Sequence, residues 1–262
     1  MRPIRSIAFS ACLAALPAHA QQSADELAKQ LSNPVAALIS VPFQLNYDSG
    51  YANDGDKWTL NVQPVIPVDI SRDWNLISRT ILPVIRQSKV VNNGTQTGLG
   101  DTVQSLFFSP KAPTATGWIW GAGPVFLLPT ATEDELGSGK WGLGPTAVAL
   151  KQTADGWTYG ALANHIWSVA GDDARADVNA TFLQPFLSKG IGQGRTLTVN
   201  SESTYDWERK QWTIPVNFMY AKVTKFGNQL VSLQGGVRLY LDAPSGGPDW
   251  GLRFVVTLLY PR

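Results

Sequence analysis

Charged and amide side chains recur at alternate positions within otherwise apolar stretches of this sequence. The stretch WGLRFVVTLLY at 250–260 sets Arg253 between large apolar neighbours, and TLTVNSESTYDW at 196–207 sets Glu202 and Asp206 on one face. Comparable positions are held by Arg79, Asn164, Asn200, Asn217, Gln234 and Arg238, with Asn61 and Gln63. Such groups could line a polar pore or bind a small molecule, or they could form a salt-bridge network that fills a narrow interior.

His165, in ANHIWS, is the candidate for a general base. Ser168 lies three residues further on, so in a strand its side chain points to the opposite face. A nucleophile and its base must share a face within hydrogen-bond reach. We therefore expect no catalytic residues, and we interpret His165 as a polar residue at an interface or facing lipid.

Neither a cofactor nor a metal site is predicted. The glycine-rich GSGKWGLGP at 137–145 lacks the phosphate-loop pattern and reads as a turn that runs into a strand. The acidic loop TATEDELGSG could bind divalent cations that bridge lipopolysaccharide, or it could be solvated. The formal net charge of +1, without a large basic patch, indicates no nucleic-acid partner.

Strands must position these residues, because apolar and polar residues alternate with a period of two along most of the chain. Turn signals divide it into about twelve segments. We place them at 35–47, 57–70, 74–86, 99–109, 117–129, 140–151, 157–169, 176–188, 195–207, 211–224, 230–241 and 249–260. The segments 99–109, 140–151 and 176–188 alternate poorly.

The N-terminal residues read as a secretory signal peptide, 1–20, with basic residues, an apolar stretch and AHA before the cleavage point. Residues 21–34 are a helical candidate that could lie in the periplasm or plug a barrel, and 35–262 form the sheet. Removal of 1–20 takes away Cys12, so the mature chain has no cysteine for a disulfide.

A membrane barrel explains the alternation better than a soluble sandwich or lipocalin-like barrel, which would turn its apolar face inward. Strands of 10 to 13 residues match a tilted crossing of the bilayer. Aromatic residues near strand ends predict two interfacial girdles: Trp58, Trp74, Trp118, Trp157, Trp207, Trp212, Trp250 and Tyr260. The fold prediction is therefore an all-β, up-and-down antiparallel barrel in the outer membrane, with a short N-terminal helix.

The connections alternate in length and charge. The longer ones, among them DSGYANDGD and TATEDELGSG, are acidic, whereas the shorter ones carry a net positive charge. Outer-membrane barrels have short periplasmic turns and longer extracellular loops. We expect the acidic loops to face outside and both termini to face the periplasm.

Long blocks of the sequence resemble one family of outer-membrane channels, named after the meta-cleavage pathway of phenol degradation and often labelled "transporter" or "neuromedin U". The blocks include QPVIPV, WGAGPVFLLPTATEDELGSGKWGLGPTAV and ESTYDWERKQWTIPVN, and the similarity covers about 33–261. The resemblance implies uptake of aromatic compounds. The last strand, with its late aromatic Tyr260, is similar to the assembly signal of outer-membrane proteins, except that Pro261 and Arg262 follow.

The expected function is passive passage of small solutes, aromatic or otherwise amphipathic, through a narrow polar lumen. The alternatives are a closed barrel with a structural or interaction role, an outer-membrane lipid-modifying enzyme, and a soluble secreted β protein. Expected partners are outer-membrane lipids, lipopolysaccharide, the barrel assembly machinery and periplasmic chaperones, together with the solute.

Overall fold

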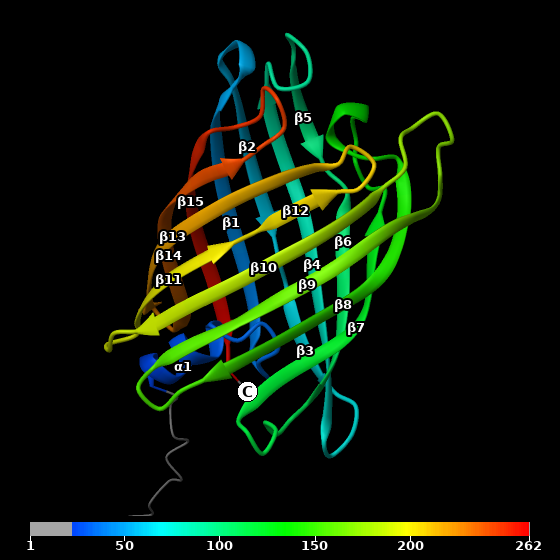
Figure 1. Ribbon diagram of the computed structural model, residues 1–262. Coiled ribbons are helices and arrows are strands. Elements are labelled where there is room, and N and C mark those ends of the chain that lie inside the picture. Colours follow the sequence, from blue (N-terminus) through cyan, green and yellow to red (C-terminus); the bar gives the residue numbers. More distant parts are fainter. Residues whose placement is uncertain (1–22, 262) are drawn as a thin grey trace, which may run out of the picture.

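The computed structural model describes residues 23–261, which form a closed antiparallel β-barrel with a short helix at one end (Figure 1). The predicted signal peptide, 1–20, and Arg262 lie outside the described residues. No helix in the described range is long and apolar enough to cross a membrane.

Fifteen strand segments build twelve barrel strands, as the sequence predicts, because three barrel strands are each interrupted once. The interrupted strands are β2 (Gly55–Val62) with β3 (Val65–Asp69), β5 (Thr95–Leu99) with β6 (Thr102–Pro110), and β11 (Arg195–Ser201) with β12 (Ser203–Asp206). The others are β1 (Ile39–Tyr51), β4 (Trp74–Ser88), β7 (Trp118–Leu128), β8 (Lys140–Gln152), β9 (Trp157–Gly171), β10 (Asn179–Gly190), β13 (Gln211–Phe226), β14 (Gln229–Asp242) and β15 (Trp250–Tyr260).

The prediction for the first strand was wrong at both ends. It begins at Ile39 instead of residue 35, because Val35 and Leu38 are buried beside helix α1 (Ala24–Leu31) and the barrel wall. It also continues to Tyr51, through a DSG sequence that reads as a turn. This extension brings Asp48 into the sheet.

The barrel closes where its first and last strands pair. β1 runs antiparallel to β15 from Ile39 opposite Tyr260 to Ser49 opposite Trp250. Closure leaves no unpaired sheet edge, as spanning a bilayer with strands requires.

Alternate side chains point to lipid and to the lumen. In β15 the exposed fraction is 54% for Phe254 but 1% for Arg253. The outer surface is therefore an apolar belt, and the opposite polarity expected of a soluble β protein is not found in the described strands.

Exposed aromatic side chains mark both ends of the belt. At the end that carries the termini, Trp74 packs on Trp120 and Trp118 packs on Tyr159. At the opposite end, the Tyr47 ring packs against Trp58 in a tilted contact and against Trp250 edge-on. The eight predicted girdle residues are all exposed: Trp74, Trp118, Trp157 and Tyr260 at the first end, and Trp58, Trp207, Trp212 and Trp250 at the second.

Helix α1 and the C-terminus lie at the same rim (Figure 1), which we call the periplasmic rim because its turns are shorter. A tag inserted in 131–138, at the other rim, is expected to be accessible to antibody on intact cells. A tag in 190–194 is expected to be accessible only after the outer membrane is permeabilised. The reverse labelling pattern would refute this orientation.

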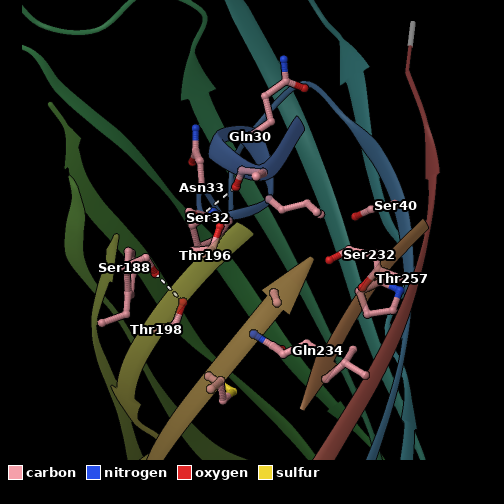
Figure 2. A pocket seen from close by; sticks show the side chains of 18 of the residues that line it. Gln30, Ser32, Asn33, Ser40, Ser188, Thr196, Thr198, Ser232, Gln234 and Thr257 are labelled. Carbon is pink, nitrogen blue, oxygen red and sulfur yellow. Dashed lines mark hydrogen bonds between the residues drawn. The ribbon is translucent and has the colours of Figure 1, made fainter. Parts of the chain in front are cut away.

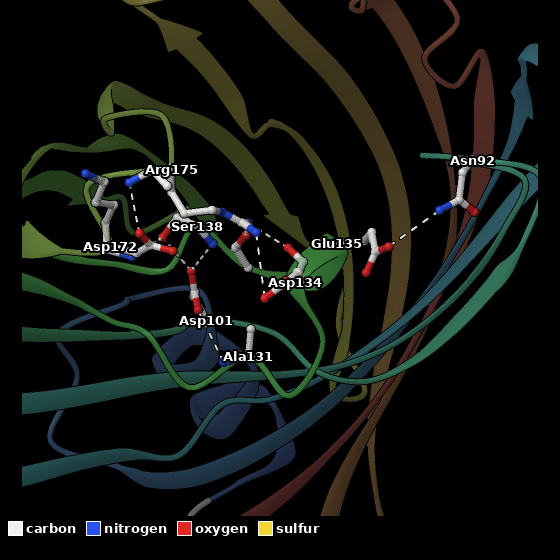
Figure 3. Close-up of polar contacts among 11 residues, drawn as sticks. Asn92, Asp101, Ala131, Asp134, Glu135, Ser138, Asp172 and Arg175 are labelled. Atoms are coloured by element: carbon white, nitrogen blue, oxygen red, sulfur yellow. Dashed lines mark hydrogen bonds and ion pairs between the residues drawn. The ribbon is translucent and has the colours of Figure 1, made fainter.

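The extracellular loops are fastened to one another (Figure 3). The Asp101 carboxylate accepts hydrogen bonds from Ser138 N and Ser138 Oγ, both at 2.6 Å. Arg175 donates to the carbonyl oxygens of Asp134, at 2.6 Å, and of Gly137. Loop 129–139 is thereby tied to the loop at 172–178.

The second of these loops also depends on an ion pair. Asp177 Oδ1 lies 3.1 Å from Nζ of the buried Lys140 and accepts a hydrogen bond from Ser168 Oγ at 3.0 Å. The hydrogen bond from Lys140, and then that from Ser168, lowers the pKa of Asp177. An acid with a lowered folded-state pKa contributes stability above its ordinary pKa and loses it as the pH falls through the lowered value.

We therefore expect loop 172–178 to resist protease at neutral pH and to become sensitive only below about pH 4. Asp177→Asn should make the loop sensitive at neutral pH, and Asp173→Asn, in the same loop, is the control. Equal cleavage of the two variants at pH 7 would show that the ion pair does not hold the loop.

Candidate functional site

Three cavities follow one another along the lumen. The upper cavity, of about 510 Å³, lies below loop 243–249 and is lined by β1, β2 and β14. The middle cavity, of about 250 Å³, lies between the barrel wall and the end of α1. The lower cavity, of about 390 Å³, is lined by α1 and by residues of the turns at 153–156 and 191–194.

Neighbouring cavities share wall residues. Gln44 and Glu202 line both the upper and the middle cavity, and Ala28, Ser32 and Thr196 line both the middle and the lower one. The series therefore extends from the extracellular loops to the periplasmic rim.

An ion pair separates the upper cavity from the middle one. Arg253 Nη1 and Nη2 donate to the two oxygens of Glu202 at 2.7 and 2.6 Å, and Arg253 Nε donates to Asn46 Oδ1 at 2.7 Å. The Arg253 side chain is 2% exposed and the Glu202 side chain 20%. Two parallel hydrogen bonds between charged groups make this a strong and geometrically specific contact.

Amides and a second arginine surround this pair. Arg79 Nη2 donates to Gln63 Oε1 at 3.2 Å, and Asn217 Nδ2 donates to Asn200 Oδ1 at 2.7 Å. Arg79 and Asn200 line the middle cavity, whereas Asn217 is wholly buried behind it. The hydrogen-bond partner of Arg79 is thus a neutral amide, and in the described structure no carboxylate lies within salt-bridge distance of Arg79.

Hydroxyl and amide groups form much of the wall of the middle cavity, together with apolar side chains and with Arg79, Glu202 and Arg253 (Figure 2). Ser188 and Thr198 hydrogen-bond to each other at 2.8 Å across β10 and β11. The labelled groups that surround the cavity are Gln30, Ser32, Asn33, Ser40, Ser188, Thr196, Thr198, Ser232, Gln234 and Thr257. These neutral groups can exchange hydrogen bonds with water or a solute.

Helix α1 lies in the periplasmic mouth of the barrel (Figure 1). Ser23 Oγ accepts from Glu26 N and caps its N-terminus, while Asp25 Oδ1 accepts from Gly194 N at 2.6 Å. Its apolar face buries Leu27 and Ala28 against a cluster that includes Leu38, Val223 and Leu259. The i, i+4 pair Leu27 and Leu31 therefore faces the wall of the barrel, and the remaining gap is the lower cavity.

An apolar cluster fills the lumen beside β4, β6, β8 and β9, which the prediction of a polar lining does not include. Ile77, Phe107, Val148, Leu150 and Leu162 pack together, with Val35 from the N-terminal segment. This explains why the middle strands alternate poorly in sequence, since inward residues of β6 and β8 belong to this cluster and Phe182 and Phe186 of β10 pack against it.

Most predicted lumen residues lie on cavity walls, but three do not: Asn217, buried behind the middle cavity, and two that lie elsewhere. Asp206 caps the extracellular turn 207–210, accepting from Glu208 N and Arg209 N and pairing with Arg209 Nη1. Asn164 lies opposite Thr146 on the wall that carries the apolar cluster. The structure adds Asn46, Asp48 and Lys57, of which Asp48 belongs to the misjudged end of β1.

His165 lies on the outer face, away from the cavities. Its Nδ1 is 2.7 Å from Thr181 Oγ1, which also accepts from Trp207 Nε1, and its ring contacts Trp167. Ser168, by contrast, contacts Asp177 at the extracellular rim. The proximity of Thr181 depends on strand pairing and has no local sequence signal.

No protein-family model matches the chain, and no curated protein matches it in sequence. Among solved structures it is similar to an outer-membrane channel from Pseudomonas putida F1, with a TM-score of 0.65 and 17% identity, over 85% of this chain and 94% of that one. It is also similar to outer-membrane phospholipase A from Escherichia coli, with a TM-score of 0.50 and 9% identity, over 84% and 90% of the two chains.

These structural similarities show the fold. The chain is a closed β-barrel with the fold of bacterial outer-membrane proteins. The likeness to the channel agrees with the family resemblance seen in the sequence, whereas the link to phenol degradation stays a prediction.

Proposed function

We propose that the barrel is a channel for passive passage of small polar or amphipathic solutes, narrowed by α1 at its periplasmic mouth. The observation that supports it most directly is the series of three cavities that share wall residues from one rim to the other. Solutes would pass the Glu202–Arg253 pair along the hydroxyl-lined wall. Size and weak contacts would select among them in the middle cavity.

A closed barrel with a structural or interaction role is the second candidate. The apolar cluster around Phe107 and the tight contact between Glu202 and Arg253 favour it, because both fill space in the lumen. A lipid-modifying enzyme is less well supported. His165 Nδ1 contacts the Thr181 hydroxyl, but Nε2 has no hydrogen-bond partner in the described structure, so the series of nucleophile, base and orienting group is incomplete.

Purified protein in planar bilayers tests the first proposal against the second. We expect discrete conductance steps, and uptake of small sugars or amino acids by proteoliposomes. Folding is checked by the heat-dependent shift in electrophoretic mobility. If the folded protein gives neither conductance nor uptake, with or without α1, the channel proposal is wrong and the structural role remains.

A further inference from the structure

Arg238 is a buried cation without a full set of partners. It is 7% exposed and lines the upper cavity. Its Nε lies 3.6 Å from Asp48 Oδ1, beyond hydrogen-bond distance, and has no hydrogen-bond partner in the described structure. A buried N–H of a charged group left in this way costs free energy, so the site favours an added acceptor.

The nearby carboxylates are already engaged. Tyr240 Oη donates to the same Asp48 Oδ1 at 2.9 Å, and Lys57 faces Asp48 directly across β1 and β2. Glu202, the other carboxylate on the cavity wall, is held by both Arg253 nitrogens. Asp48 is therefore the single carboxylate in the upper cavity that faces both Arg238 and Lys57.

The upper and middle cavities together have the same imbalance. The upper and middle cavities are lined by four cationic side chains, Lys57, Arg79, Arg238 and Arg253, and by two carboxylates, Asp48 and Glu202. An excess of two positive charges in a partly desolvated space attracts anions more strongly than it would in bulk water. The upper cavity, after the Glu202–Arg253 pair is set aside, carries an excess of one.

The geometry points to a binding site for the carboxylate of a small monoanionic organic acid in the upper cavity, held by Arg238 with Lys57 beside it. A planar guanidinium matches a carboxylate in two parallel hydrogen bonds. The Arg238 guanidinium lies over the Tyr240 ring at 5.4 Å, and Tyr51 also lines the cavity, so aromatic surface adjoins the charge. The volume of about 510 Å³ accommodates a small molecule. The inference rests on the proposed channel function, because it names the solute class.

Calorimetric titration of the full mature protein in detergent tests the site without requiring conduction. The probes are benzoate, the neutral benzyl alcohol and inorganic phosphate. We expect benzoate to bind, benzyl alcohol to bind at least about tenfold more weakly, and Arg238→Gln to weaken benzoate by a similar factor, corresponding to one lost charged contact. Arg86→Gln, a substitution on the outer face near the same rim, is the matched control.

Equal binding of benzoate and benzyl alcohol to the wild-type protein would overturn the inference, and so would unchanged benzoate binding in a folded Arg238→Gln variant. Tighter binding of phosphate than of benzoate would overturn the assignment to carboxylates. Arg238→Lys keeps the charge and removes the planar fork, so it should give intermediate binding even if Arg238→Gln does not fold. If the protein binds benzoate but gives no conductance, the channel proposal is wrong and the carboxylate site is still supported.

Discussion

Deletion of residues 23–33 is expected to raise the single-channel conductance of the barrel by about twofold or more, because the narrowest part of a pore limits conduction. The deleted segment supplies Ala28, Leu31 and Ser32 to the wall of the middle cavity. It also occupies the space between Val223 and Leu259 in the periplasmic mouth. Planar-bilayer recording of the deleted and full mature proteins gives the comparison.

A point substitution that detaches α1 from the barrel wall tests the same effect without deleting residues. Leu27→Asp places a charge in the fully buried contact of α1 and should also raise conductance, since the helix can leave the wall. Ala24→Ser changes an exposed position of the same helix that lines none of the three cavities, and it should leave conductance unchanged. Unaltered conductance in both the deletion and the Leu27 variant would show that α1 does not narrow the path.

Glu202→Gln is expected to destabilise the barrel by about 3–5 kcal/mol, because it leaves the buried Arg253 without its carboxylate. It also removes one of the two carboxylates of the upper and middle cavities, so the preference for anions should increase. Urea unfolding in lipid vesicles measures the first effect, and the reversal potential in a salt gradient measures the second.

The control for this variant is Glu208→Gln, an exposed position at the extracellular rim whose oxygen accepts from Asn179 Nδ2. The double variant Glu202→Gln/Arg253→Gln should lose less stability than the sum of the single variants, because the uncompensated charge is gone. Additive losses would mean that the two side chains contribute independently.

Period-two alternation carried most of the information about the fold. It predicts Trp58, Leu60 and Val62 on one face of a strand and Thr59, Asn61 and Gln63 on the other, as the barrel has them. The aromatic positions near strand ends predict the two girdles for the same reason, because a bilayer imposes one polarity on every crossing. The alternation did not predict the end of the first strand at Asp48, because the sequence DSG is a local turn signal. Pairing with β15 keeps these residues in the strand.

The sequence by itself determined a closed barrel with an apolar exterior and an inward Arg253, because the side-chain period and the bilayer act on each strand separately. Only the tertiary structure decided how the inward groups meet. Glu202 and Arg253 are 51 residues apart in the sequence, yet their side chains form an ion pair across the lumen. Phe107 and Val35 pack together in the apolar cluster. These contacts depend on strand tilt, register and closure, which are properties of the whole sheet and are not encoded within any one strand.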